Sequence, residues 1–135
     1  MAVCTLVQVV YTTVTKEAII AGGVSNNRYY AYYPKVLAGE MNDAIEAVLY
    51  VVDADGTVRC SETDTYSVVD YLTLLMTTYE AYAAYKNYMT VSVELLGYGA
   101  AAQENFGYKT ETPANAIVFE KGWDKFALAE DPTPV

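Results

Sequence analysis

Two helical segments joined by a tyrosine-rich connection constrain the fold of this chain more than any other feature. The first helix is predicted from Ser67 to about residue 80, because Ser67 and Asp70 have the spacing of a capping box, with Asp in place of the usual Glu. An apolar face follows at helical spacing, formed by Val68, Tyr71, Leu72, Leu75 and Met76. The chain therefore contains a helix that needs a partner to cover this face.

A second helix is predicted over residues 87–106, and Gly107 has the position of its C-terminal stop. Apolar residues recur along it at steps of three and four: Val91, Leu95, Tyr98, Ala102 and Phe106. Gly97, Gly99 and residues 100–102 keep one side of this helix thin. We expect another element to pack closely against that side.

The remaining segments favour strands. Runs rich in β-branched and aromatic residues predict strands at 3–14, 28–33 (stopped by Pro34), 44–52 and 57–61, the last two joined by a hairpin at DADG, residues 53–56. Residues 35–43 suggest one helical turn. A short strand is predicted at 116–120, held down by Trp123 and Phe126.

These elements indicate an α+β fold in which an antiparallel sheet of about four strands is packed by a two-helix hairpin. Residues 1–130 are expected to form a single compact module, with a frayed tail at 131–135.

Charge and hydropathy exclude several classes of function. The net charge of −9 is the wrong sign for binding nucleic acid or an anionic membrane surface, and it suits a partner with a basic patch. No apolar stretch is long enough for a transmembrane helix, so no membrane insertion is expected. The first 13 residues lack the positive charge of a signal peptide and alternate like a strand.

We expect no enzyme, because the chain has no histidine for a catalytic triad or an imidazole metal ligand. Lysine or carboxylate-pair chemistry needs no histidine, but 17 acidic residues produce carboxylate pairs by chance. The DADG segment resembles the start of a calcium loop, but Gly56 stands at its fourth position and Asp64 at its twelfth, where Glu is required. GYGAAAQ lacks the third glycine of a phosphate-binding loop. No metal and no cofactor are therefore predicted.

The two cysteines, Cys4 and Cys60, do not have the paired spacing of a zinc site. Both fall on predicted strands. They either form one disulfide or remain as buried thiols.

Tyrosine is concentrated in two places. On an extended strand, Tyr29 and Tyr33 share one face and Tyr30 and Tyr32 the other, so at least one pair faces away from a core. In the connection between the helices the spacing is three, at Tyr79, Tyr82, Tyr85 and Tyr88, which on a continuous α-helix drifts around the helix axis and forms no clean core stripe. These rings either cap a small core with their hydroxyls in water or form a binding surface, with Arg28 as an additional anchor.

Three segments carry a resemblance to a known kind of module: AGEMNDAIEAVLYVVDADGTV (38–58), YSVVDY (66–71) and LLGYGAAAQENFGYKTETPANA (95–116). Over about residues 38–116 the chain resembles a module of large secreted or cell-surface proteins of gut Firmicutes. The resemblance implies an extracellular or cell-wall-associated bacterial setting, and it implies no catalytic activity and no established site.

The sequence therefore leads us to expect a non-catalytic recognition module that binds a host protein, such as immunoglobulin, through its tyrosines. Two other functions stay open, a structural spacer in a multidomain surface protein and a carbohydrate-binding module.

Overall fold

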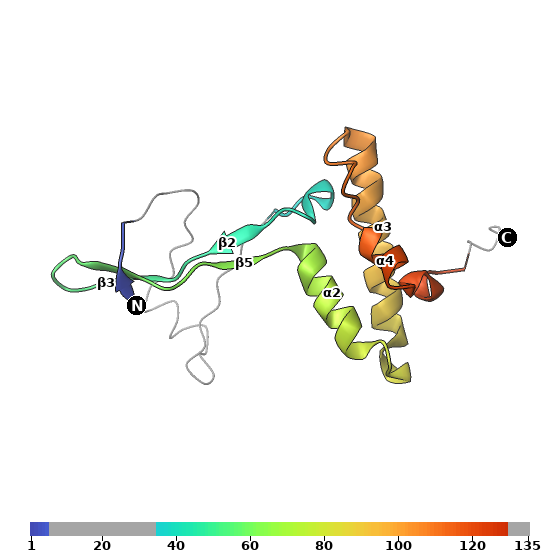
Figure 1. Ribbon diagram of the computed structural model, residues 1–135, viewed down its shortest axis with the longest axis horizontal. Coiled ribbons are helices and arrows are strands. Elements are labelled where there is room, and N and C mark those ends of the chain that lie inside the picture. Colours follow the sequence, from blue (N-terminus) through green and yellow to red (C-terminus); the bar gives the residue numbers. More distant parts are fainter. Residues whose placement is uncertain (6–34, 130–135) are drawn as a thin grey trace. The chain divides into compact units, whose positions relative to one another are not determined.

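The computed structural model describes residues 1–5 and 35–129 (Figure 1). They form two compact units, one with residues 1–5, 35–36 and 49–62 and the other with residues 37–48 and 63–129. The predicted strand at 28–33, most of the strand at 3–14 and the tail at 131–135 lie outside the described residues. Arg28, Tyr29, Tyr30, Tyr32 and Tyr33 lie outside them too. That the whole chain forms one module stays a prediction.

The first unit contains a three-stranded antiparallel sheet in the order β1-β4-β3, formed by β1 (Ala2–Val3), β3 (Tyr50–Val52) and β4 (Val58–Cys60). The predicted hairpin at DADG is confirmed. The Asp53 N–H donates to the Thr57 carbonyl over 2.8 Å, and Gly56 adopts a φ of 87° that a residue with a Cβ rarely takes. Asp-Gly therefore supplies the local conformation that returns the chain antiparallel to itself.

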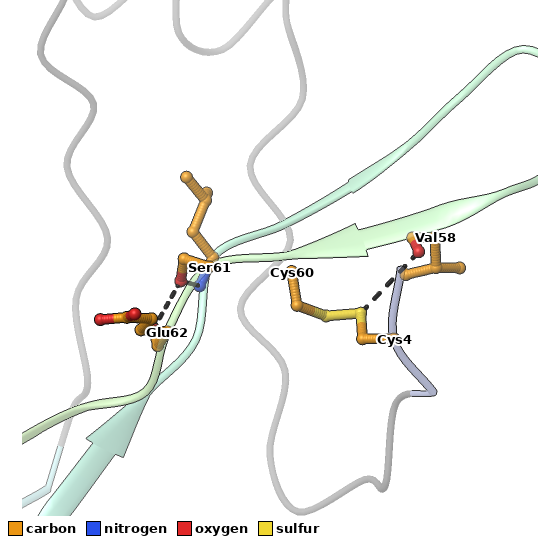
Figure 2. Close-up of a disulfide and its surroundings, with 6 residues drawn as sticks. Cys4, Val58, Cys60, Ser61 and Glu62 are labelled. Carbon is orange, nitrogen blue, oxygen red and sulfur yellow. Dashed lines mark hydrogen bonds between the residues drawn. A yellow bond between two sulfur atoms is a disulfide. The ribbon is translucent and has the colours of Figure 1, made fainter. Parts of the chain in front are cut away.

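A disulfide joins Cys4 to Cys60, with the two Cα atoms 5.8 Å apart (Figure 2). The bond is possible because β1 pairs with β4, and the Cys4 N–H donates to the Val58 carbonyl over 3.1 Å just beyond that pairing. The alternative of two buried thiols is thereby excluded.

The prediction of one strand over 44–52 is wrong, because this segment contains two strands in different sheets. Its first part, β2 (Ile45–Ala47), pairs with β5 (Asp64–Tyr66) in the second unit, while β3 pairs with β4 in the first. Two residues separate β2 from β3, but three residues separate β4 from β5. A single ladder cannot continue in register across unequal gaps, and the one-residue offset divides the predicted sheet.

The helical hairpin of the second unit is confirmed as α2 (Val68–Tyr79) and α3 (Lys86–Phe106), with a short 3₁₀ turn, η2 (Ala83–Tyr85), between them. The capping box closes in both directions. Ser67 Oγ accepts from the Asp70 N–H, and Asp70 Oδ2 accepts from the Ser67 N–H, each over 3.0 Å. Gly107 ends α3 in the left-handed conformation, with a φ of 63°.

The core of the second unit forms between helices and not between helices and a sheet. Residues of β2 and β5 are exposed or half-buried, whereas α2 and α3 lie side by side (Figure 1). The core consists of Leu72, Met76, Met89, Val93, Leu96, Val118 and Trp123. The expected sheet packed by a helical hairpin is thus corrected to a helical core with a largely exposed two-stranded ladder.

Residues 116–120 form a helix, α4 (Ala116–Glu120), and not the predicted strand. It buries Val118, and the 3₁₀ turn η3 (Trp123–Phe126) then buries Trp123, with Phe126 partly buried, as expected for the two aromatic residues. A run of four apolar residues, AIVF, is too short for its periodicity to distinguish a helix from a strand. The helical neighbours decide the conformation here.

A short segment, residues 37–43, forms a strap whose 3₁₀ turn packs against α3. This turn is η1 (Ala38–Glu40), the helical turn expected within residues 35–43. Gly99 has no side chain and lets Met41, Ala38 and Ala114 approach closely, so the thin side of α3 does accept another element. Gln103 is 1% exposed, and its side chain holds the loop after α3 by accepting from the Ala114 N–H and donating to the Thr112 carbonyl. The conspicuous GYGAAAQ motif therefore has a packing role.

Candidate functional site

The four tyrosines of the interhelix connection lie where α2 ends and α3 begins. The backbone here bonds over three residues, because the Tyr82 N–H donates to the Tyr79 carbonyl and the Tyr85 N–H to the Tyr82 carbonyl, each over 3.0 Å. Tyr82 has an extended backbone, with φ −106° and ψ 112°, so no continuous helix runs from Tyr79 to Tyr88. The drift expected on a continuous α-helix is interrupted at Tyr82, and the rings on either side of this break come together.

The rings contact one another and form one tyrosine cluster (Tyr79, Tyr82, Tyr85 and Tyr88). Tyr85 is central, with its ring centroid 4.3 Å from that of Tyr79, 6.3 Å from Tyr82 and 5.8 Å from Tyr88. The Tyr79 and Tyr85 rings are stacked, the Tyr82 ring meets Tyr85 edge-on, and the Tyr88 ring is tilted. These are the geometries that aromatic quadrupoles favour.

The cluster faces solvent. Tyr82 and Tyr88 are 60% and 59% exposed, Tyr85 is 36% exposed and Tyr79 is half-buried. Of the two interpretations left open by the sequence, capping a core fits Tyr79 alone. The other three rings form an exposed aromatic surface.

A buried contact fixes the base of the cluster. The Trp123 indole N–H donates to Glu80 Oε2 over 2.6 Å, and Trp123 itself is 1% exposed. Glu80 directly follows the last residue of α2. The turn that carries the tyrosines is thus attached to the core at Glu80, and this attachment reduces the backbone entropy that would be lost when a partner binds the turn.

A second polar group joins the strap to the end of α3. Asp43 accepts hydrogen bonds from Lys109 Nζ over 2.6 Å and from Tyr108 Oη over 2.7 Å. The bond from Lys109, and after it the bond from Tyr108, lowers the pKa of Asp43, while the same carboxylate raises the pKa of Tyr108 and of Lys109. All three side chains are accessible to solvent, and they act as a tie between two segments.

A hollow of about 480 Å³ lies along α3. It is lined by Gly97, Ala100, Ala101, Gln103, Glu104, Thr110, Pro113 and Asn115. Among these residues Glu104 carries the only charge, so the lining offers no pair of carboxylates. Gly97, unlike Gly99, faces open space, so this part of the thin side stays uncovered.

Within residues 1–5 and 35–129, no group of three or more acidic, cysteine or histidine side chains is arranged to hold a metal ion. No helix in the same ranges is long and apolar enough to cross a membrane.

Comparison with known proteins gives no assignment, since no family model, no curated protein and no solved structure matches this chain.

The structure brings together four of the predicted site residues, Tyr79, Tyr82, Tyr85 and Tyr88, and it places Cys4 and Cys60 in a disulfide away from them in sequence. The apolar series predicted on α3 is not the one that the core buries, because Val91, Tyr98 and Phe106 are exposed. Sequence reasoning missed the buried series, which is Met89, Val93 and Leu96. Its signal was present, since these residues recur at steps of four and three along the same helix.

Proposed function

We propose that this chain is a non-catalytic recognition module of a bacterial surface or secreted protein, and that it binds a protein partner through the tyrosine cluster. One observation carries the proposal: four tyrosines are connected ring to ring, three of them are exposed, and the turn beneath them is anchored in the core. Tyrosine provides large contact area at low entropic cost, which is why protein interfaces favour it.

The ring geometry favours a protein partner over the two other functions. A sugar platform needs coplanar rings side by side, whereas Tyr79 and Tyr85 stack on each other and Tyr82 stands at 84° to Tyr85. A spacer needs no exposed aromatic surface and would bury or scatter these rings. A contiguous, uneven aromatic surface suits the grooves and side chains of a folded protein.

The setting that we propose is extracellular or associated with the cell wall. The Cys4–Cys60 disulfide supports it, because such bonds persist in oxidising compartments. The resemblance to modules of gut Firmicutes points to a host protein as the partner, and immunoglobulin is our first candidate. The net charge of −9 favours a partner surface that is basic.

The proposal is tested by measuring the affinity of the chain for purified human immunoglobulin with surface plasmon resonance. We expect saturable binding, and we expect Tyr82→Ala/Tyr85→Ala to weaken it by about 100-fold or more, since central interface tyrosines often contribute about 2 kcal/mol or more each. Tyr71→Ala is the matched control, because Tyr71 is 55% exposed on α2 but is not a member of the cluster. It should change affinity less than about twofold.

Circular dichroism establishes that each variant is folded. Undiminished binding by a folded Tyr82→Ala/Tyr85→Ala variant would show that the cluster is not the site. If immunoglobulin does not bind, the same immobilised variants are exposed to serum and intestinal secretions. If neither the wild type nor the double variant retains any protein saturably, the spacer function is favoured.

A further inference from the structure

Helix α3 has two apolar faces, and within residues 1–5 and 35–129 the core covers one of them. Met89, Val93 and Leu96 are buried against the rest of the second unit. A second series is exposed, which we call the outer stripe: Val91 (65% exposed), Leu95 (38%), Tyr98 (65%), Ala102 (half-buried) and Phe106 (79%).

The outer stripe is large for an exposed apolar patch. With the areas typical of large apolar side chains, its members expose on the order of 500 Å². Each partner of a stable protein interface contributes about 800 Å², so the stripe would be the apolar centre of such an interface and its rim would supply the rest. Exposed apolar patches above a few hundred Å² mark interaction sites in soluble proteins. Tyr88, one step earlier on the same side of the helix, would add to the area.

The spacing of the stripe indicates that a helix covers it. Val91, Leu95, Tyr98 and Ala102 are separated by four, three and four residues, and Tyr88 and Asn105 continue the same alternation at both ends. Phe106, the remaining member of the stripe, follows Asn105 and lies at the edge of this series. This series is the seam of a two-helix coiled coil, in which side chains of one helix insert between those of another. It extends over most of the 21 residues of α3.

We propose that the occupant is α3 of a second copy of this chain, packed antiparallel about a two-fold axis level with Leu96 and Gly97. In that arrangement Leu95 meets the partner's Tyr98, Val91 meets the partner's Ala102, and Tyr88 meets the partner's Asn105. Large side chains face smaller ones in every layer. The seam is self-complementary, as a two-fold interface requires.

A parallel pair is less suitable. It would place Tyr98 against Tyr98 and Ala102 against Ala102, so that one layer is overfilled and another underfilled. Antiparallel packing also places the positive end of each helix dipole beside the negative end of the other, which is favourable.

The salt dependence of binding distinguishes a second copy of this chain from a basic partner. The outer stripe contains no charged residue, while each copy has a net charge of −9. Two copies therefore repel each other, and salt weakens that repulsion. A pair of these chains should associate more tightly as salt rises, whereas a complex with a basic partner would weaken.

The first experiment measures mass by analytical ultracentrifugation of the intact chain at about 50 mM and about 500 mM NaCl, on either side of physiological ionic strength. The expected result is a monomer–dimer equilibrium that shifts toward the dimer at the higher salt. A chain that stays monomeric at every accessible concentration, or that dissociates as salt rises, would overturn the proposal.

The second experiment tests the register. Leu95→Glu and Tyr98→Lys, each alone, should weaken the dimer about 100-fold or more, because each buries an unpaired charge in both copies. Together in one chain they should restore the dimer to within about tenfold of wild type, because antiparallel packing places the carboxylate introduced in one copy opposite the ammonium group introduced in the other.

Leu74→Glu is the matched control, because Leu74 is an exposed leucine on α2, 59% exposed against 38% for Leu95. It should leave the dimer unchanged. A dimer that survives Leu95→Glu excludes the outer stripe, and a double variant that stays monomeric while folded excludes the antiparallel register. Tyr88 belongs to both the tyrosine cluster and the seam. None of these variants changes a residue of the cluster, however, and Tyr82→Ala/Tyr85→Ala changes no residue of the seam. The dimer and the immunoglobulin proposal can therefore fail separately.

Discussion

Gly99 and Gln103 lie one helical turn apart on α3, and each is required for a different physical reason. A Cβ on Gly99 would lie 2.7 Å from Met41 Sδ, 3.1 Å from the Ala38 carbonyl oxygen and 3.2 Å from Ala114 Cβ, so no side chain fits without a shift. Gln103 provides an acceptor for the Ala114 N–H at 2.8 Å and a donor to the Thr112 carbonyl at 3.2 Å. A buried backbone group left unpaired costs about 1–3 kcal/mol.

The two glycines of α3 give a matched prediction. Gly99→Ala should lower the free energy of unfolding by about 1–2 kcal/mol, because the strain of overpacking exceeds the gain in helix propensity. Gly97→Ala should raise it by up to about 1 kcal/mol, because nothing lies within 4 Å of its added Cβ. Urea denaturation followed by circular dichroism measures both. Equal stability of the two variants would contradict the packing of the strap on Gly99.

At the scale of elements, ties between segments distant in sequence hold the second unit together. The strap reaches α3 through Met41 and Gly99, and Asp43 binds Tyr108 and Lys109 just beyond the helix end. Glu80 binds Trp123 in the same way at the opposite end of the hairpin. Each tie fixes a loop that would otherwise depend on local preferences alone.

The tie at Asp43 predicts a pH dependence. The folded-state pKa of Asp43 lies below the ordinary value of 3.8, so its stabilising contribution is complete above that pH and is lost as pH falls through the lowered pKa. Asp43→Asn removes this contribution at neutral pH. The difference in unfolding free energy between wild type and Asp43→Asn should therefore shrink as pH falls from about 6 to about 2.

Urea denaturation across this pH range measures the difference. Lys109→Gln removes the largest cause of the lowered pKa and should flatten the same dependence. A gap between wild type and Asp43→Asn that is constant with pH would show that the carboxylate charge does not hold the strap.

Elements also show where local patterns stop being decisive. The helices at 68–79 and 86–106 were predictable because caps, stops and apolar spacing agree over several turns. The conformations of segments 44–52 and 116–120 were not predictable, because a short apolar run can form either a strand or a helix. The elements that pack against it decide between the two. The paired strand at 64–66 carried no apolar signal and depends on its partner, residues 45–47.

At the scale of the whole molecule, the disulfide closes a large loop. Its sequence separation of 56 residues corresponds to about 4 kcal/mol of lost unfolded-chain entropy in the loop-closure model. Reduction should therefore lower the midpoint of urea denaturation. The variant Cys4→Ser/Cys60→Ser should show a comparable loss and should no longer respond to reductant. A wild type that is indifferent to reductant would mean that the bond contributes nothing to stability.

The candidate site was predictable in part. The spacing of Tyr79, Tyr82, Tyr85 and Tyr88 identified an aromatic connection that is not a core stripe, and the sequence alone left open whether the rings are buried. Their exposure and mutual contact depend on the 3₁₀ turn and on Trp123, which is 43 residues from Glu80. The tyrosines at 29–33 stay a prediction.

The sequence by itself determined the features that act within a few residues: the start of α2 at Ser67, the stop of α3 at Gly107 and the turn at Gly56. Caps and tight turns depend on local backbone conformation, so their residues can be read directly. Only the tertiary structure decided which apolar face of α3 is buried and that residues 116–120 form a helix. It also decided that the tyrosine rings contact one another at the surface. These outcomes depend on which other elements are available to cover each surface. A surface is buried only when a second element packs against it, so burial cannot be read from one segment alone.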